Sequence, residues 1–150
     1  MHEIKFRGKR KDNGEWVQGY VHKLNNGIDK GTTFIIPERA SALYSAEVDP
    51  ETVGQYIGIK DGNKHEIYTG DIISQECECD TEYGCYHAPT HDIVIWDQEK
   101  AGFDFEALKK GVYSGEMLED YADEWTIIGN RWDNPELLAP KEGADKHEPV

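Results

Sequence analysis

Three cysteines and two histidines lie within fifteen residues of one another in the middle of the chain. They are Cys77, Cys79, Cys85, His87 and His91, spaced as C-x-C-x5-C-x-H-x3-H. Thiolate and imidazole groups are the ligands that Zn²⁺ prefers, and four of them complete a tetrahedral structural site. Residues i and i+2 share a face of an extended strand, so the first two sulfurs can point toward one ion. The spacing predicts a zinc site, and the alternative is an acidic loop with incidental thiols.

The same segment offers a second chemistry, nucleophilic catalysis by Cys85 with His87 or His91 as the base. The acidic residues around Cys85 would disfavour its thiolate by like-charge repulsion. Further along, the carboxylates between residues 116 and 124 are expected to form the solvated side of a helix, not a catalytic pair. We therefore expect a protein without enzymatic activity.

Basic residues cluster near the N-terminus, at Lys5, Arg7, Lys9, Arg10 and Lys11. Trp16 and Tyr20 follow closely, and basic side chains beside aromatic ones are typical of nucleic-acid contacts that include stacking. The alternative is the solvent-exposed side of an edge strand, where Lys and Arg deter pairing with another chain. We favour the alternative, because the chain as a whole is acidic.

The charge is large and unevenly distributed. The 150 residues include 30 Asp and Glu against 16 Lys and Arg, a net charge of −14. Residues 1–12 hold five basic and two acidic residues, so they carry +3 and the remainder carries −17. This balance argues against broad nucleic-acid binding and against an anionic membrane surface. No apolar run is long enough to span a membrane, the N-terminus does not resemble a signal peptide, and the odd cysteine count favours a reducing cytoplasm.

Short apolar and β-branched segments separated by turn signals predict a mainly β protein, a barrel or sandwich. The clearest candidate strands cover residues 4–7, 16–21, 32–36, 55–59, 92–96, 102–106 and 126–130. One short C-terminal helix is expected from Ser114 to Trp125, where apolar residues recur at helical spacing. We expect a single domain over residues 1–138 and a disordered tail over 139–150.

Three blocks of the sequence share a distinctive pattern: IKFRGKRKDNGEWVQGY (4–20), VDPETVGQYIGIKDGNKHEIYTGDII (48–73), and IVIWD (93–97) with the ending IIGNRWDNPEL (127–137). Together they closely resemble the YopX family of phage and prophage proteins. The resemblance implies a small pseudo-barrel with SH3-like hairpins, in which Gly70 supplies a sharp bend, and a place in the cytoplasm of a bacterial host. It implies no activity. Between Ile73 and Ile93 the sequence departs from the family pattern, so the resemblance does not guide the cysteine-rich segment.

Three functions remain open, in this order. The first is a non-enzymatic phage accessory protein that binds a host or phage protein, one with a basic surface given the acidity of this chain. The second is a structural-zinc protein that uses residues 77–91. The third is a nucleic-acid-associated small barrel that uses the N-terminal basic strand. Short exposed strands also favour a homo-oligomer.

Overall fold

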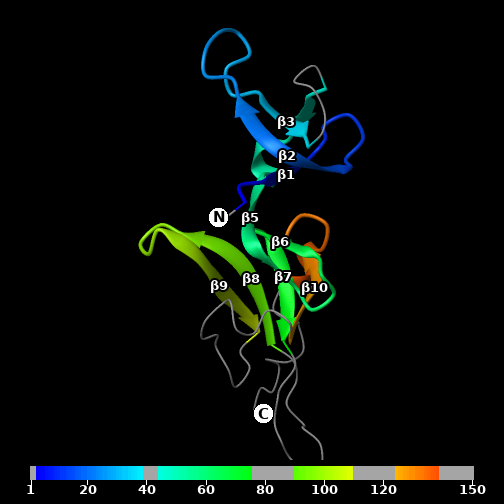
Figure 1. Ribbon diagram of the computed structural model, residues 1–150, viewed down its shortest axis with the longest axis vertical. Helices are drawn as coiled ribbons and strands as arrows, with labels where there is room; N and C mark the ends of the chain where they lie inside the picture. The colour runs from blue at the N-terminus through cyan, green and yellow to red at the C-terminus, as the bar shows by residue number, and fades with distance from the viewer. Residues whose placement is uncertain (1–2, 39–43, 76–89, 110–123, 139–150) are drawn as a thin grey trace, which may run out of the picture. The chain divides into compact units, whose positions relative to one another are not determined.

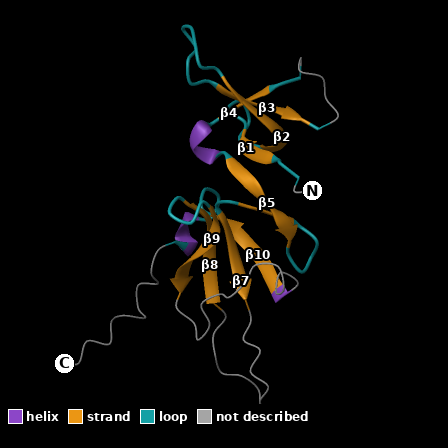
Figure 2. Cartoon of the chain, turned by 60° about the vertical axis from the view of Figure 1, so that its left-hand side comes forward, coloured by secondary structure: helices purple, strands orange, loops and turns teal. Residues whose placement is uncertain are grey.

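The computed structural model describes residues 3–38, 44–75, 90–109 and 124–138 (Figure 1). These ranges contain ten β-strands, with 3₁₀ turns that include Pro50–Thr52 and Pro135–Leu137, which confirms the mainly β class. Strands, drawn in orange, dominate the cartoon in Figure 2. All the strand pairings given for these ranges are antiparallel, and neither of the two sheets closes into a continuous barrel there. No helix in this part of the chain has the length and apolarity needed to cross a membrane.

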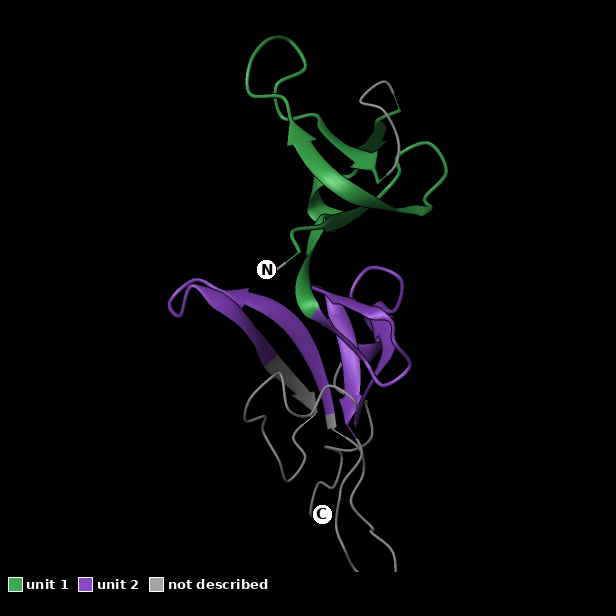
Figure 3. Ribbon diagram, viewed as in Figure 1, with its two compact units in different colours: residues 1–58 green, residues 59–150 purple. Residues whose placement is uncertain are grey.

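The chain divides into two compact units, residues 1–58 and residues 59–150, which we call unit 1 and unit 2 (Figure 3). The expected single domain over residues 1–138 stays a prediction. The expected disordered tail, 139–150, lies outside the described residues.

Unit 1 is built from five consecutive strands. They are β1 (Phe6–Lys9), β2 (Trp16–Lys23), β3 (Thr33–Pro37), β4 (Ala46–Val48) and β5 (Gly54–Lys60), with a 3₁₀ turn at Pro50–Thr52. The hydrogen-bonded order is β4-β3-β2-β1-β5, and β5 continues across the boundary into unit 2. An antiparallel bridge between Arg10 and Val48 joins the end of β1 to β4, so the sheet curls over its core.

The core of unit 1 contains Ile35 and Val48, both fully buried. Gly8 faces them: a Cβ atom there would lie 3.0 Å from Cβ of Val48 and 3.2 Å from Cδ1 of Ile35. The strand can pass this close because glycine has no side chain. β1 pairs with both β2 and β5, so the interpretation of the basic segment as an edge strand is wrong.

Unit 2 contains β6 (Glu66–Tyr68) beside the end of β5, and a four-stranded sheet in the order β10-β7-β8-β9. The strands of that sheet are β7 (Asp71–Gln75), β8 (Thr90–Asp97), β9 (Gly102–Lys109) and β10 (Trp125–Asn130). The buried apolar residues of unit 2 come from β6 and from this sheet: Ile67, Tyr68, Ile72, Ile73, Ile93, Val94 and Trp125. A second 3₁₀ turn follows at Pro135–Leu137.

Trp125 begins a strand and does not end a helix, which corrects the expected helix Ser114–Trp125 at its last residue. Its backbone pairs with Gln75 of β7, and its ring packs edge-on against Phe105, with 4.9 Å between the centroids. Pairing and burial in the sheet outweigh a helical pattern that is local in sequence. Residues 114–123 of the expected helix lie outside the described residues.

Asp61 joins the turn after β5 to β10. Its side chain is fully buried, and its carboxylate accepts hydrogen bonds from the backbone N–H groups of Asn63, His65 and Ile127. Burial acts to raise the pKa of Asp61, but the three donated hydrogen bonds outweigh it and hold the pKa below its ordinary value. The ionised carboxylate is therefore part of the fold.

Candidate functional site

One side of the unit 1 sheet gathers basic and aromatic side chains from β1, β2 and β3. Because Gly8 faces the core, its neighbours Arg7 and Lys9 point to the opposite side. The β1–β2 ladder places Lys9 opposite Trp16 and Arg7 opposite Gln18. We call this surface the basic–aromatic face. It comprises Arg7, Lys9, Trp16, Gln18, Tyr20, His22 and Phe34, and the same ladders place Ile36 opposite Tyr20 and the carboxylate Glu47 opposite Phe34 on it.

Two cations of the face lie against one indole ring. The guanidinium carbon of Arg7 is 4.7 Å from the ring centroid of Trp16, and Nζ of Lys9 is 5.5 Å from it. Each such cation–π contact contributes about 0.5–1 kcal/mol at an exposed site. The contacts hold two long basic side chains on the same side of the sheet as the aromatic residues of β2.

The aromatic part of the face continues along β2. Tyr20 and His22 follow Trp16 at even spacing, so all three point to the same side of the strand. The β2–β3 ladder places Phe34 opposite His22. Tyr20 is exposed, with 57% of its surface accessible. The sheet thus presents the accessible phenol ring of Tyr20 on β2, on the same side as Arg7 and Lys9 of the neighbouring strand β1.

Lys5, Arg10 and Lys11 complete the expected basic cluster. Lys5 is buried, with Nζ 3.4 Å from Glu3, 3.9 Å from Glu38 and 5.5 Å from the ring centroid of Tyr56. The structure therefore uses Lys5 inside unit 1.

Arg10 and Lys11 are paired beyond the end of β1. Arg10 donates two hydrogen bonds to Asp12, at 3.0 and 2.6 Å, and this pairing raises the pKa of Arg10 and lowers that of Asp12. Nζ of Lys11 lies 3.5 Å from Glu47 of β4. Of the five predicted residues, Arg7 and Lys9 are the pair that the structure places on the basic–aromatic face.

The predicted zinc ligands fall mostly outside the described residues, since Cys77, Cys79, Cys85 and His87 belong to the segment 76–89. His91 is described and lies in β8, opposite Ser74 of β7. Among the residues that the structure describes, no three His, Cys, Asp or Glu side chains gather closely enough to hold a metal ion. The zinc site stays a prediction.

The two units differ sharply in charge. Residues 1–58 contain eight Lys and Arg and eight Asp and Glu, so unit 1 has no net charge. Residues 59–150 contain eight Lys and Arg against 22 Asp and Glu, so unit 2 carries the whole net charge of −14. The charge division falls between the units, and the basic–aromatic face belongs to the neutral one.

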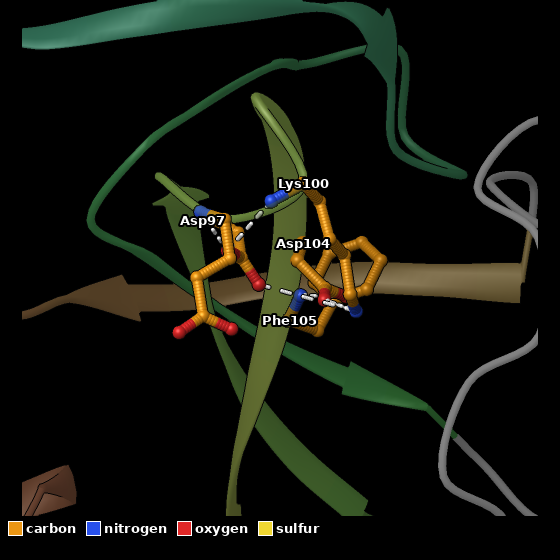
Figure 4. A network of polar contacts seen from close by, with 5 residues as sticks. Asp97, Lys100, Asp104 and Phe105 are labelled. Carbon is orange, nitrogen blue, oxygen red and sulfur yellow. Dashed lines mark hydrogen bonds and ion pairs between the residues drawn. The ribbon is translucent and has the colours of Figure 1, made fainter.

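The turn between β8 and β9 shows how the acidic unit uses its few cations. The ammonium group of Lys100 forms a hydrogen bond with Asp104 and lies 3.9 Å from Asp97 (Figure 4). The hydrogen bond to Asp104, followed by the charge of the same carboxylate, raises the pKa of Lys100. Glu99 is exposed in the same turn, and its charge adds a smaller contribution in the same direction.

Three residues of the basic–aromatic face were not recognised in the sequence: Gln18, His22 and Phe34. A signal for the first two is present, because Trp16, Gln18, Tyr20 and His22 alternate with smaller or apolar residues over the length of β2. Phe34 had no such signal, since its place on the face depends on the register between β2 and β3.

Comparison with known proteins agrees with this architecture. Residues 5–139 match the model of the YopX protein family. The chain is similar to the crystal structure of protein EF1440 from Enterococcus faecalis, with a TM-score of 0.55 and 23% sequence identity over 93% of this chain and 100% of that one. At this identity the likeness concerns the fold alone. No curated protein matches the chain. Since the family match covers nearly all of the sequence, the chain belongs to the YopX protein family.

Proposed function

We propose that this protein is a non-enzymatic accessory protein of a phage or prophage, acting in the cytoplasm of the bacterial host. In this proposal unit 2 binds a partner protein that has a basic surface. The observation that carries the proposal is the division of charge: unit 2 has a net charge of −14, and unit 1 has a net charge of zero.

A charge of this size creates a potential that acts beyond direct contact. Complementary potentials speed the encounter of two proteins and suppress partners of like charge, and both effects weaken as salt is added. The described part of unit 2 presents exposed carboxylates at separate places, including Glu99 after β8 and Glu136 in the last 3₁₀ turn. A basic protein surface is the partner that such a distribution attracts most strongly.

The experiment compares charge changes of equal size in the two units. The full-length protein is used to capture partners from host-cell lysate at about 0.05 M and about 0.5 M salt, where screening differs strongly. One variant carries Glu99→Gln and Glu136→Gln in unit 2. The matched control carries Asp29→Asn and Glu51→Gln, two exposed carboxylates of unit 1.

We expect basic proteins to be retained at the lower salt and released at the higher one. The unit 2 variant should retain several-fold less, because it removes charge from the binding unit, and the control should behave as the parent does. Equal losses in the two variants, or retention that salt does not alter, would contradict the proposal.

The β7–β8 ladder supports the structural zinc site as a second candidate function. Gln75 pairs with Thr90, so the two ends of segment 76–89 are held side by side on neighbouring strands. The ladder already holds the two ends of this segment together. A metal bound within it would therefore cost less loop-closure entropy than it would in a free chain. The metal content of the reduced protein tests this role.

A further inference from the structure

We propose that the basic–aromatic face of unit 1 binds single-stranded DNA, with a base stacked on Tyr20 and phosphates held by Arg7 and Lys9. This site lies on a different unit from the acidic surface described above and does not depend on it. It assigns a ligand to basic residues of a chain whose overall charge is acidic.

The two cations of the face are held close together. Arg7 and Lys9 both lie over the ring of Trp16, at 4.7 and 5.5 Å from its centroid. Guanidinium and ammonium groups are the usual partners of backbone phosphates. Because the contacts with the ring already restrain these side chains, they lose less conformational entropy when a ligand binds. Two phosphate contacts are therefore preorganised on one strand.

Tyr20 provides a surface on which a base can stack. Tyr20 is 57% exposed and projects from an eight-residue strand paired on both sides. Stacking a base on an aromatic side chain requires an accessible ring on a rigid support, and sheets of this kind supply it in many single-strand-binding proteins. Gln18 lies between Trp16 and Tyr20 on the same side, where its amide can donate to and accept from a base edge.

The face selects an unpaired form of nucleic acid. The bases of a duplex have their faces covered by neighbouring base pairs, so stacking on Tyr20 requires an unpaired strand. Stacking and phosphate contacts need no 2′-hydroxyl, the group by which proteins distinguish RNA from DNA. The face thus contains what single-stranded DNA needs, and binding there requires no RNA-specific contact.

The acidity of the chain is compatible with this site. The net charge belongs to residues 59–150, and unit 1 is neutral overall. Repulsion between exposed charges is largely screened beyond about 10 Å at 0.1 M salt, whereas contacts at the face act at short range. Neutralising two phosphates of a single strand gives a slope of about −1.4 for log K against log salt, much shallower than for a basic protein.

The test measures fluorescence anisotropy of a labelled twelve-nucleotide oligothymidine with the full-length protein. Tyr20→Ala removes the stacking surface, and Tyr44→Ala is its matched control, since Tyr44 is also exposed in unit 1 but lies outside the face. The double variant Arg7→Gln and Lys9→Gln removes the phosphate contacts. Lys23→Gln with Lys30→Gln removes the same charge from other exposed positions of unit 1.

We expect Tyr20→Ala to weaken binding about tenfold or more, and Tyr44→Ala to leave it unchanged. The Arg7 and Lys9 variant should weaken binding and bring the salt slope close to zero, while its control keeps the parental slope. Equal melting temperatures establish that each variant is folded. A duplex of the same length should bind more weakly, and the matching RNA should bind no more than threefold tighter.

Four results would overturn the proposal. They are no binding at about 0.1 mM protein, equal losses in test and control variants, duplex binding as tight as that of the single strand, and an RNA preference of tenfold or more.

Discussion

The indole of Trp132 lies directly against the backbone of Gly70. A Cβ atom built on Gly70 would come within 2.4 Å of the ring atoms Cη2 and Cζ3, a distance that non-bonded carbons do not tolerate. Gly70 also has a φ angle of +92°, in the region that favours glycine. The bend expected at Gly70 is therefore confirmed. The structure adds that the Trp132 ring leaves no space for a side chain at this position.

Replacing Gly70 by Ala is expected to destabilise the protein severely. Overpacking costs about 1–3 kcal/mol, and the left-handed backbone costs an L-residue about 1–2 kcal/mol more. Chemical denaturation of Gly70→Ala measures the sum. Gly27→Ala is the control, because Gly27 has a similar φ of +86° with open space around it. A loss no larger than that of the control would show that Trp132 does not restrict this position.

Asp61→Asn should remove a stabilisation that depends on pH. The amide can replace only part of the carboxylate's accepting capacity toward Asn63, His65 and Ile127, and a buried unsatisfied group costs about 1–3 kcal/mol. The folded pKa of Asp61 is below its ordinary value of 3.8. Its stabilisation is therefore complete well above that value and is lost as the pH falls through the folded pKa. Urea melts at several pH values should show the gap to the parent closing in acid, and a constant gap would exclude the linkage.

Asp92 should behave in the opposite way. It is half-buried in β8, opposite Ile73, and burial raises its pKa above the ordinary value. Its ionised form therefore costs stability, and this cost develops as the pH rises through the ordinary and then the folded pKa. Asp92→Asn is expected to raise the melting temperature at pH 7 and to leave it unchanged in acid, as scanning calorimetry can measure. A lower melting temperature at pH 7 would show that the carboxylate is stabilising.

Purified, reduced protein is expected to carry one zinc ion per chain, bound by four of the five cysteine and histidine residues between 77 and 91. Elemental analysis measures the content, and a chelator should lower the melting temperature. Cys79→Ser and Cys85→Ser should each reduce the zinc content, whereas His65→Ala should not, because His65 lies outside that segment. If the protein contains no zinc and the chelator does not change its melting temperature, the zinc site is contradicted and the segment is an acidic loop with incidental thiols.

Most strands could be predicted because their pattern is local. The run Thr32–Ile36 predicts a strand where β3 covers Thr33–Pro37, and the run Thr126–Asn130 predicts one where β10 covers Trp125–Asn130. Alternation and β-branched residues carry this information within a few positions. The same local pattern predicts a helix as far as Trp125. That prediction is wrong at Trp125 because this residue pairs with Gln75, fifty positions earlier in the chain, and a local pattern does not contain this pairing.

The candidate site was predictable only in part. The sequence brings five basic residues together, but their partners come from other strands: Lys11 meets Glu47 of β4, and Lys5 meets Glu38 after β3. Gly8 faces the core, so Lys5, Arg7 and Lys9 alternate to the other side, and the burial of Lys5 against Glu3, Glu38 and Tyr56 separates it from the other two cations. Burial of this kind is a property of packing that no composition reveals.

The long reach of Asp61 has a consequence for the order of folding. Ile127, one of its three donors, is 66 residues further along the chain, so this carboxylate lacks a full set of partners until β10 has been synthesised. The strand ladders of unit 1 involve only residues up to Gln55, and contacts close in sequence form early. Because chains fold from the N-terminus as they emerge from the ribosome, unit 1 can complete its ladders while unit 2 is still being made. A nascent chain would then display its basic–aromatic face before its most acidic part has left the ribosome.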